Sequence, residues 1–287
     1  MNTDNASLYV KWLKQEVAPA LGCTEPVAIS FAAAYAAQYL DQPCTKISGF
    51  ISANLYKIAM GVTIPGTTVC GVPLAAAIGA FGGDPQKGLK TLEDITPRHV
   101  EMAQKLIANN AVDIAVEETP DFIHLDLTLS AGENCCRVVV KGTHTNVVEL
   151  YINGQPQPLS EKQNTHTQRE TLPTFSLQQA YEFINRVDFN DIRFILDAAR
   201  LNSALAAEGK TKKYGLNING TFSDAVKNGL MSNDLLSKVI INTVAASDAR
   251  MGGAPVVAMS NFGSGNQGIT ATMPVVVVAE HLGVDEE

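Results

Sequence analysis

The chain has 287 residues, of which 46% are hydrophobic, so it can bury the core of one large domain or two modest ones. Its formal net charge is −8 and its lysines and arginines are scattered, which excludes the basic surface that nucleic acids and anionic membranes require. No apolar run reaches the roughly 20 residues of a membrane span and the N-terminus is polar, so we expect a cytoplasmic protein.

Residues 7–40 predict two helices with an interruption at Pro19–Pro26. The second, from Val27 to Leu40, is Ala-rich and carries no charge, and Pro26 suits the first turn of a helix. Cys23 is therefore expected at or just before a helix N-terminus, where unpaired amides and the helix dipole favour a thiolate. Such a cysteine is a nucleophile or a metal ligand, and the alternative is a small buried apolar residue.

Extended and helical patterns alternate over the next part of the chain. Residues 43–54 predict a strand, 74–81 a buried helix and 97–110 an amphipathic helix. Residues 111–153 alternate with period two, which indicates an antiparallel meander with one solvent-exposed face.

Helices return in the C-terminal part, over 176–186, 191–208, 223–229 and 233–247, before a glycine-rich and then apolar stretch, 260–283. We therefore predict an α+β fold in which a mainly helical body, residues 1–110 and 176–287, carries an inserted antiparallel β-meander, 111–155, and an exposed linker, 156–175. A compact domain seldom stops just after its most apolar run, so either the final helix is buried or the body continues beyond this chain.

The five cysteines do not form a disulfide framework or a self-contained zinc site. No Cys-x-x-Cys or His-x-x-x-His spacing occurs. Cys44 and Cys70 are expected in the core. Cys135 and Cys136 are neighbours on a strand, and their side chains point to opposite faces.

Two polar clusters are candidates for substrate binding. Gly263–Gly268 matches G-x-G-x-x-G, but the second strand of a dinucleotide site is missing. The favoured interpretation is that backbone amides at the start of a helix bind a carboxylate. Arg250, in a glycine-bounded loop, adds a cation there, and the alternative is a surface arginine paired with Asp248. The second cluster consists of polar residues in apolar surroundings: Asn54, Lys57 and Thr67.

Lys57 and His144 are the candidates for proton transfer. Lys57 lies among apolar residues, where its ammonium is partly desolvated or, alternatively, reaches out to water. His144 lies in a polar interruption between strands, which suits acid–base work, although lone histidines are more often structural.

Five segments together resemble one family. They are EVAPALGCTEP (16–26), GVTIPGT (61–67), RFILDAARLN (193–202), SDARMGG (247–253) and SNFGSGNQGITATMPVVVVAEHLG (260–283). They resemble the L-cysteine desulfidase family, which is related to the catalytic chain of bacterial iron–sulfur L-serine dehydratases and has many uncharacterised members. The resemblance covers nearly the whole chain.

The resemblance implies a lyase that converts L-cysteine to pyruvate, ammonia and sulfide by α,β-elimination. It also implies a 4Fe–4S cluster held by three cysteines, with one iron open as a Lewis acid for the substrate. Cys23 matches one of the three, and the other two belong to a region beyond the 279–283 segment that this chain does not contain. The alternatives are an L-serine dehydratase of the same chemistry and a non-catalytic amino-acid-binding remnant.

The resulting site assignment has three parts. Cys23 is the expected metal ligand, and Lys57 or His144 is the expected base. The residues expected to bind the small amino-acid substrate are Thr24, Asn54, Thr67, Arg250, Ser264, Gly265 and Asn266. No nucleic acid or membrane is expected as a partner, and a homodimer or a complementing C-terminal fragment is left open.

Overall fold

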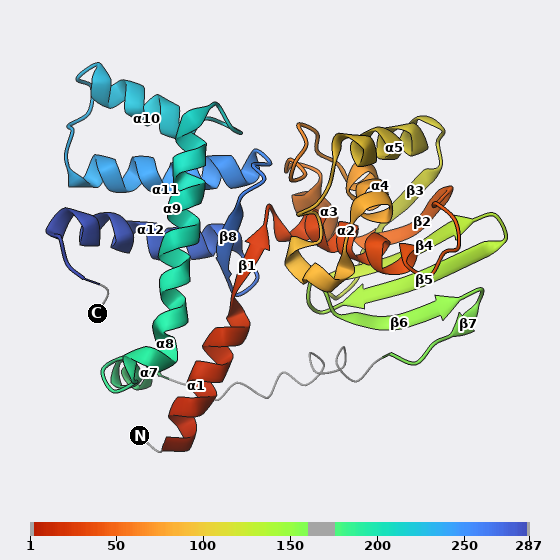
Figure 1. The fold of residues 1–287 in the computed structure, drawn as a ribbon, viewed down its shortest axis with the longest axis horizontal. Helices are drawn as coiled ribbons and strands as arrows, with labels where there is room; N and C mark the ends of the chain where they lie inside the picture. Colours follow the sequence, from red (N-terminus) through yellow and green to blue (C-terminus); the bar gives the residue numbers. More distant parts are fainter. Residues whose placement is uncertain (1–2, 160–175, 286–287) are drawn as a thin grey trace. The chain divides into compact units, whose positions relative to one another are not determined.

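The computed structural model describes residues 3–159 and 176–285, which form two compact units (Figure 1). Unit 1 contains the described residues of Met1–Ala20, Arg169–Arg250 and Val256–Glu287, and unit 2 those of Leu21–Gln168 and Met251–Pro255. Most of the predicted linker, residues 160–175, lies outside the described residues, and its start forms a short strand, β7 (Gln155–Pro156).

Unit 2 is built on a six-stranded mixed sheet in the order β3-β2-β4-β5-β6-β7. The other strands are β2 (Lys46–Ser52), β3 (Val112–Glu117), β4 (His124–Ala131), β5 (Asn134–Lys141) and β6 (Val147–Ile152). Strand β2 pairs with β3 in parallel, whereas β4 to β7 form the antiparallel part. The expected meander therefore begins at β4, because β3 pairs with an earlier strand of the chain.

Helices cover one face of this sheet (Figure 1). They are α2 (Thr24–Ala37), α3 (Ala53–Ala59), α4 (Val72–Gly82), the 3-10 helix η1 (Pro85–Lys90) and α5 (Pro97–Ala108). The alternation of β4 supplies the matching surface, because Leu125, Leu127 and Leu129 are fully buried while the residues between them are partly exposed.

Helix α2 is the centre of the unit 2 core. Its residues are buried almost without exception from Thr24 to Ala36, as expected for a helix that is apolar all round. The hydroxyl of Ser30 donates to the carbonyl of Ala75 in α4 at 2.7 Å, so the polar group in the middle of α2 is satisfied. This burial fixes α2 firmly and therefore fixes the residues at its N-terminus.

Unit 1 is helical around a two-stranded sheet formed by β1 and β8. Its elements are α1 (Thr3–Glu16), β1 (Val17–Leu21), α7 (Leu177–Ile184), α8 (Phe189–Ile192), the 3-10 helix η2 (Arg193–Ile195), α9 (Leu196–Thr211), α10 (Ile218–Lys227), α11 (Leu235–Met251), β8 (Val257–Asn261) and α12 (Gly265–Leu282). The backbone amide of Met259 in β8 donates to Oδ1 of Asn202 in α9 at 2.9 Å, which joins helix and strand.

The α+β class predicted from the sequence is confirmed. The interruption between the first two helices is a short strand, β1, rather than a loop, and its pairing with β8 depends on residues far away in the chain. Helix α10 begins at Ile218, earlier than the sequence pattern indicated. None of the helices that the structure describes combines the length and the hydrophobicity needed to cross a lipid bilayer.

Candidate active site

Cys23 is the N-cap residue of α2 and is 4% exposed, so its predicted position at a helix start is confirmed. Its thiol donates a hydrogen bond to Oε2 of Glu25 at 2.9 Å instead of capping the helix. The hydroxyl of Thr24 donates to the same oxygen at 3.1 Å. The start of α2 thus places a sulfur next to a carboxylate.

Glu25 carries the fixed negative charge of this cluster. Burial raises the pKa of Glu25. The neighbouring imidazole of His144 and the hydrogen bond from Cys23 outweigh this effect and lower the pKa from 4.5 to about 2. Its side chain is 14% exposed, so solvent screens this charge only weakly. Glu25 is therefore ionised at every pH at which the protein is expected to work.

His144 lies in the loop between β5 and β6, with Nε2 3.9 Å from Oε1 of Glu25. This separation exceeds a hydrogen bond, and it becomes an ion pair when the imidazole takes up a proton. Asn146 closes the loop, because its Nδ2 donates to the carbonyl of Lys141 at 2.9 Å and its own carbonyl accepts from the Lys141 amide at 3.0 Å. The loop thus brings an imidazole to the start of α2, as its predicted acid–base role requires.

Segments from three of the five sequence motifs meet next to Cys23. Gly22 has φ +69° and leaves no room for a side chain, since a Cβ there would lie 2.2 Å from Cγ of Pro65. Gly253, with φ +80°, accepts from the amide of Gly66 at 3.1 Å, and a Cβ on it would lie 2.7 Å from Cγ2 of Thr63. The glycines therefore permit close packing of the 61–67 loop against both neighbouring motifs.

The predicted polar cluster of unit 2 is only partly assembled. Thr67 folds its own loop, since its hydroxyl lies 2.8 Å from the carbonyl of Ile64 and accepts from the amide of Val69 at 3.1 Å. Asn54 and Lys57 lie on α3 and are both exposed. Lys57 therefore follows the alternative given for it, a side chain that reaches water: α3 turns it outward while Leu55 and Ala59 face the core.

The predicted residues of unit 1 gather at the start of α12. Arg250 lies in the last turn of α11 and is 2% exposed, so both its placement in a loop and the surface alternative are wrong. Its guanidinium packs on Gly265, where a Cβ would lie 2.2 Å from Nε. The hydroxyl of Ser264 accepts from the amide of Gln267 at 3.3 Å, and Oδ1 of Asn266 accepts from Ser247 at 3.2 Å.

Asp248 binds Asn219 instead of serving as a surface partner for Arg250. Its Oδ2 accepts from the backbone amide of Asn219 at 2.9 Å and from the side-chain Nδ2 at 3.1 Å. Asp248 is 5% exposed, so this buried carboxylate is held by hydrogen bonds that join α10 to α11.

The thiols of this chain do not fit an iron–sulfur cluster by themselves. Cys44 is buried as expected and donates to the carbonyl of Lys46, whereas Cys70 is exposed, against expectation. Burial raises the pKa of Cys136 to about 12, and the neighbouring Cys135 adds to the rise. Among residues 3–159 and 176–285, which include all five cysteines, no three His, Cys, Asp or Glu side chains gather as metal ligands.

Sequence reasoning missed the central role of Glu25. This residue contacts Cys23, Thr24 and His144, whereas the sequence indicated only that it is polar and precedes a proline. An acidic residue in the first turn of an otherwise apolar helix was the available signal. Its contact with His144 depends on the position of the β5–β6 loop, which no local pattern shows.

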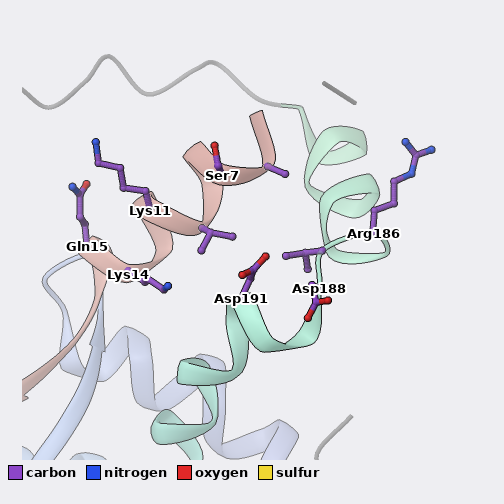
Figure 2. A pocket seen from close by; sticks show the side chains of 10 residues that line it. Ser7, Lys11, Lys14, Gln15, Arg186, Asp188 and Asp191 are labelled. Carbon is purple, nitrogen blue, oxygen red and sulfur yellow. The ribbon is translucent and has the colours of Figure 1, made fainter. Parts of the chain in front are cut away.

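A separate pocket of about 640 Å³ in unit 1 lies between α1 and the α7–α8 segment (Figure 2). It contains none of the residues selected from the sequence, and Val10 and Val187 contribute apolar lining. Figure 2 shows Asp191 directed into it, while Lys11 and Arg186 point away. The pocket lacks the converging thiol, carboxylate and imidazole that make the start of α2 the better candidate for chemistry.

The fold and this cluster define an α+β protein whose reactive side chains gather at a buried helix N-terminus. A family model described as serine dehydratase alpha chain matches residues 86–287, which is more than half of the chain. The chain therefore belongs to the serine dehydratase alpha chain family. No solved structure matches it.

Several curated relatives carry only the name UPF0597 protein. One from Klebsiella pneumoniae is 98% identical over 287 residues, covering 100% of this chain and 68% of the relative. One from Chromobacterium violaceum is 46% identical, covering 97% and 65%. YhaM from Escherichia coli is 44% identical, also covering 97% and 65%. The chain thus spans about two thirds of the length of the curated relatives it matches.

Proposed function

We propose that this chain forms the substrate-proximal part of a lyase that releases ammonia from a small L-amino acid by α,β-elimination. Membership of the serine dehydratase alpha chain family supports the lyase class. The observation that carries the proposal is the cluster at the start of α2, where Cys23 and His144 both contact an ionised Glu25. Buried reactive groups beside a fixed charge are typical of functional sites.

His144 is the proposed base. It removes the α-proton of the substrate, the β-substituent departs with the bonding electron pair, and an enamine forms. The enamine takes up a proton to become an imine, which water hydrolyses to pyruvate and ammonia. The ionised Glu25, 3.9 Å from Nε2, stabilises the imidazolium formed in the first step. Lys57 is the second candidate, and its exposure makes it the weaker one.

L-cysteine is the substrate that the sequence resemblance implies, with sulfide as the leaving group. L-serine is a second candidate, because the description of the matching family names serine dehydratase. The two substrates differ at one atom, so nothing in the fold of the α2 start separates them. Thr24, Asn54 and Thr67 are proposed to contact the substrate near this point.

A carboxylate-binding site is proposed within unit 1, at the start of α12. Arg250 supplies a cation there, and the amides of Ser264, Gly265 and Asn266 lie at the positive end of the helix dipole. Because Arg250 is 2% exposed, the side chains around Gly265 have to move before an anion reaches it. Arg250→Lys is expected to raise KM for the amino acid more than it lowers kcat, since lysine cannot form the bidentate contact.

Cys23 is proposed as a single ligand of a 4Fe–4S cluster. The cluster would supply a Lewis acid for the leaving group. Since no three His, Cys, Asp or Glu side chains gather as metal ligands among the described residues, the remaining ligands are proposed to come from the polypeptide that the longer relatives possess outside the aligned part.

The test is pyruvate release from L-cysteine and from L-serine by the Klebsiella pneumoniae relative, numbered as in this chain. His144→Gln is expected to lower kcat about 10²- to 10⁴-fold, whereas His281→Gln, at an exposed position on α12, leaves kcat unchanged. Near-normal turnover by His144→Gln would show that His144 is not the base. If Lys57→Ala alone lowers turnover, Lys57 is the base. A protein that binds either amino acid in calorimetry but releases no pyruvate is the non-catalytic alternative.

A further inference from the structure

The outer face of α12 is apolar and uncovered. The inward face carries Ile269, Met273 and Val277, which are 0%, 2% and 7% exposed. On the opposite side, residues at helical spacing form a second apolar stripe, which we call the outer stripe: Ala271, Val275, Val278 and Leu282. Val275 is 67% exposed and Leu282 is 66% exposed, so α12 presents large apolar side chains to water.

This helix differs from an ordinary surface helix in its sequence. No charged residue occurs from Gly265 to Ala279, and α12 is apolar throughout residues 273–279. A helix that is apolar all round belongs in the interior of a protein. α2 and α4, which are also apolar along most of their length, are largely buried. α12 differs from them, because Val275 and Leu282 are exposed.

Unit 1 exposes further apolar side chains beyond the outer stripe. Leu236 at the start of α11 is 67% exposed, and Val284, just after α12, is 58% exposed. The hydroxyl of Ser247 on α11 donates to Oδ1 of Asn266 on α12 at 3.2 Å, so these two helices meet near the start of α12. Large exposed apolar surface on a protein marks a contact surface.

We propose that the outer stripe is the docking surface for the additional polypeptide of the longer relatives. The 98% identical relative is matched over only 68% of its length, so about a third of it has to pack elsewhere. The valine and alanine side chains of the stripe are short and leave shallow grooves, which suit the apolar face of a helix. The occupant is thus an amphipathic helix from the same polypeptide rather than a separate partner.

The experiment compares the 287-residue chain with the Klebsiella pneumoniae relative, using Val275→Asp and a matched control, Thr270→Asp, at an exposed position off the stripe. In the relative, Val275→Asp is expected to lower Tm by about 4 °C or more, because a charge replaces a buried valine. In the 287-residue chain, Val275→Asp is expected to change Tm little. Thr270→Asp is expected to change Tm little in both proteins.

A measurement on the unmodified proteins avoids dependence on a variant that fails to fold. Amide hydrogen exchange over residues 271–282 is expected to be about tenfold or more slower in the longer relative than in this chain. Equal exchange rates together with equal tolerance of Val275→Asp would overturn the proposal. A dimer of the 287-residue chain that Val275→Asp converts to a monomer would also overturn it, since a second copy would then be the occupant.

Discussion

Glu25→Gln is the most informative single substitution for the electrostatics of the site. Glutamine keeps the size of the side chain but removes the charge that accepts from Cys23 and faces His144. The fall of the Glu25 pKa from 4.5 to about 2 favours the ionised form in the folded protein by about 3 kcal/mol, at about 1.4 kcal/mol per pH unit. The side chain is 14% exposed, so little of this is lost to screening.

The sign of the pH dependence follows from the lowered pKa. The stabilisation is fully present above the pKa of the unfolded chain, 4.5, and is lost as the pH falls toward about 2. We expect Glu25→Gln to lower the free energy of unfolding by about 3 kcal/mol at pH 7. Between pH 6 and pH 3 the difference between wild type and variant shrinks by about 2 kcal/mol.

The assay is urea denaturation followed by circular dichroism at a series of pH values. Glu133→Gln is the control, because Glu133 is an exposed carboxylate in the turn between β4 and β5 of the same unit. It is expected to change the free energy of unfolding by less than about 0.5 kcal/mol. A Glu25→Gln effect that stays constant from pH 6 to pH 3 would refute the account of a strongly ionised carboxylate at this site.

Three further substitutions and modifications test the packing around the site. Gly22→Ala is expected to lower the free energy of unfolding by about 3 kcal/mol or more, because the new Cβ would meet Pro65. The control Gly132→Ala shares the positive φ but has open space, and is expected to lower it by about 1 kcal/mol. Equal losses would contradict the contact with Pro65. Asp248→Ala is expected to cost about 2–4 kcal/mol by leaving Asn219 unpaired, and denaturation against exposed Asp224→Ala measures it. Alkylation at pH 8 followed by peptide mass spectrometry should modify exposed Cys70 long before Cys136, and comparable rates would show that Cys136 is not buried.

The start of α2 was predictable from sequence because its signals are local. Pro26 and the uncharged Ala-rich run indicate a helix, and they place Cys23 at its N-cap. The same holds for α4 and α5, whose apolar spacing and terminal glycine or proline residues are adjacent in the chain. The residue ranges of these helices therefore follow from their own local sequence.

Long-range pairings were not predictable in this way. The parallel pairing of β2 with β3 and the pairing of β1 with β8 join distant segments, whereas the alternation of each strand is the same for either kind of partner. Glu25 was missed for the same reason, because it lies near His144 only when the β5–β6 loop reaches α2.

At two positions, neighbouring residues in the sequence were a poor guide to neighbours in space. Lys57 is surrounded by apolar residues in the chain, but a helix distributes them around its axis and leaves this lysine exposed. Arg250 is followed by two glycines, which indicated a loop, yet the helix continues to Met251 and buries the guanidinium.

The central claim is that the start of α2 is the reactive site, and the most direct measurement of it is pyruvate release by a Cys23→Ala variant. The Klebsiella pneumoniae relative, purified anaerobically and numbered as in this chain, is assayed with L-cysteine and with L-serine beside a Cys44→Ala control. Cys44 is a buried cysteine whose thiol donates to the carbonyl of Lys46 at 3.3 Å. The account predicts that Cys23→Ala abolishes pyruvate release and that Cys44→Ala retains it. Turnover by Cys23→Ala close to that of the wild type would contradict the account.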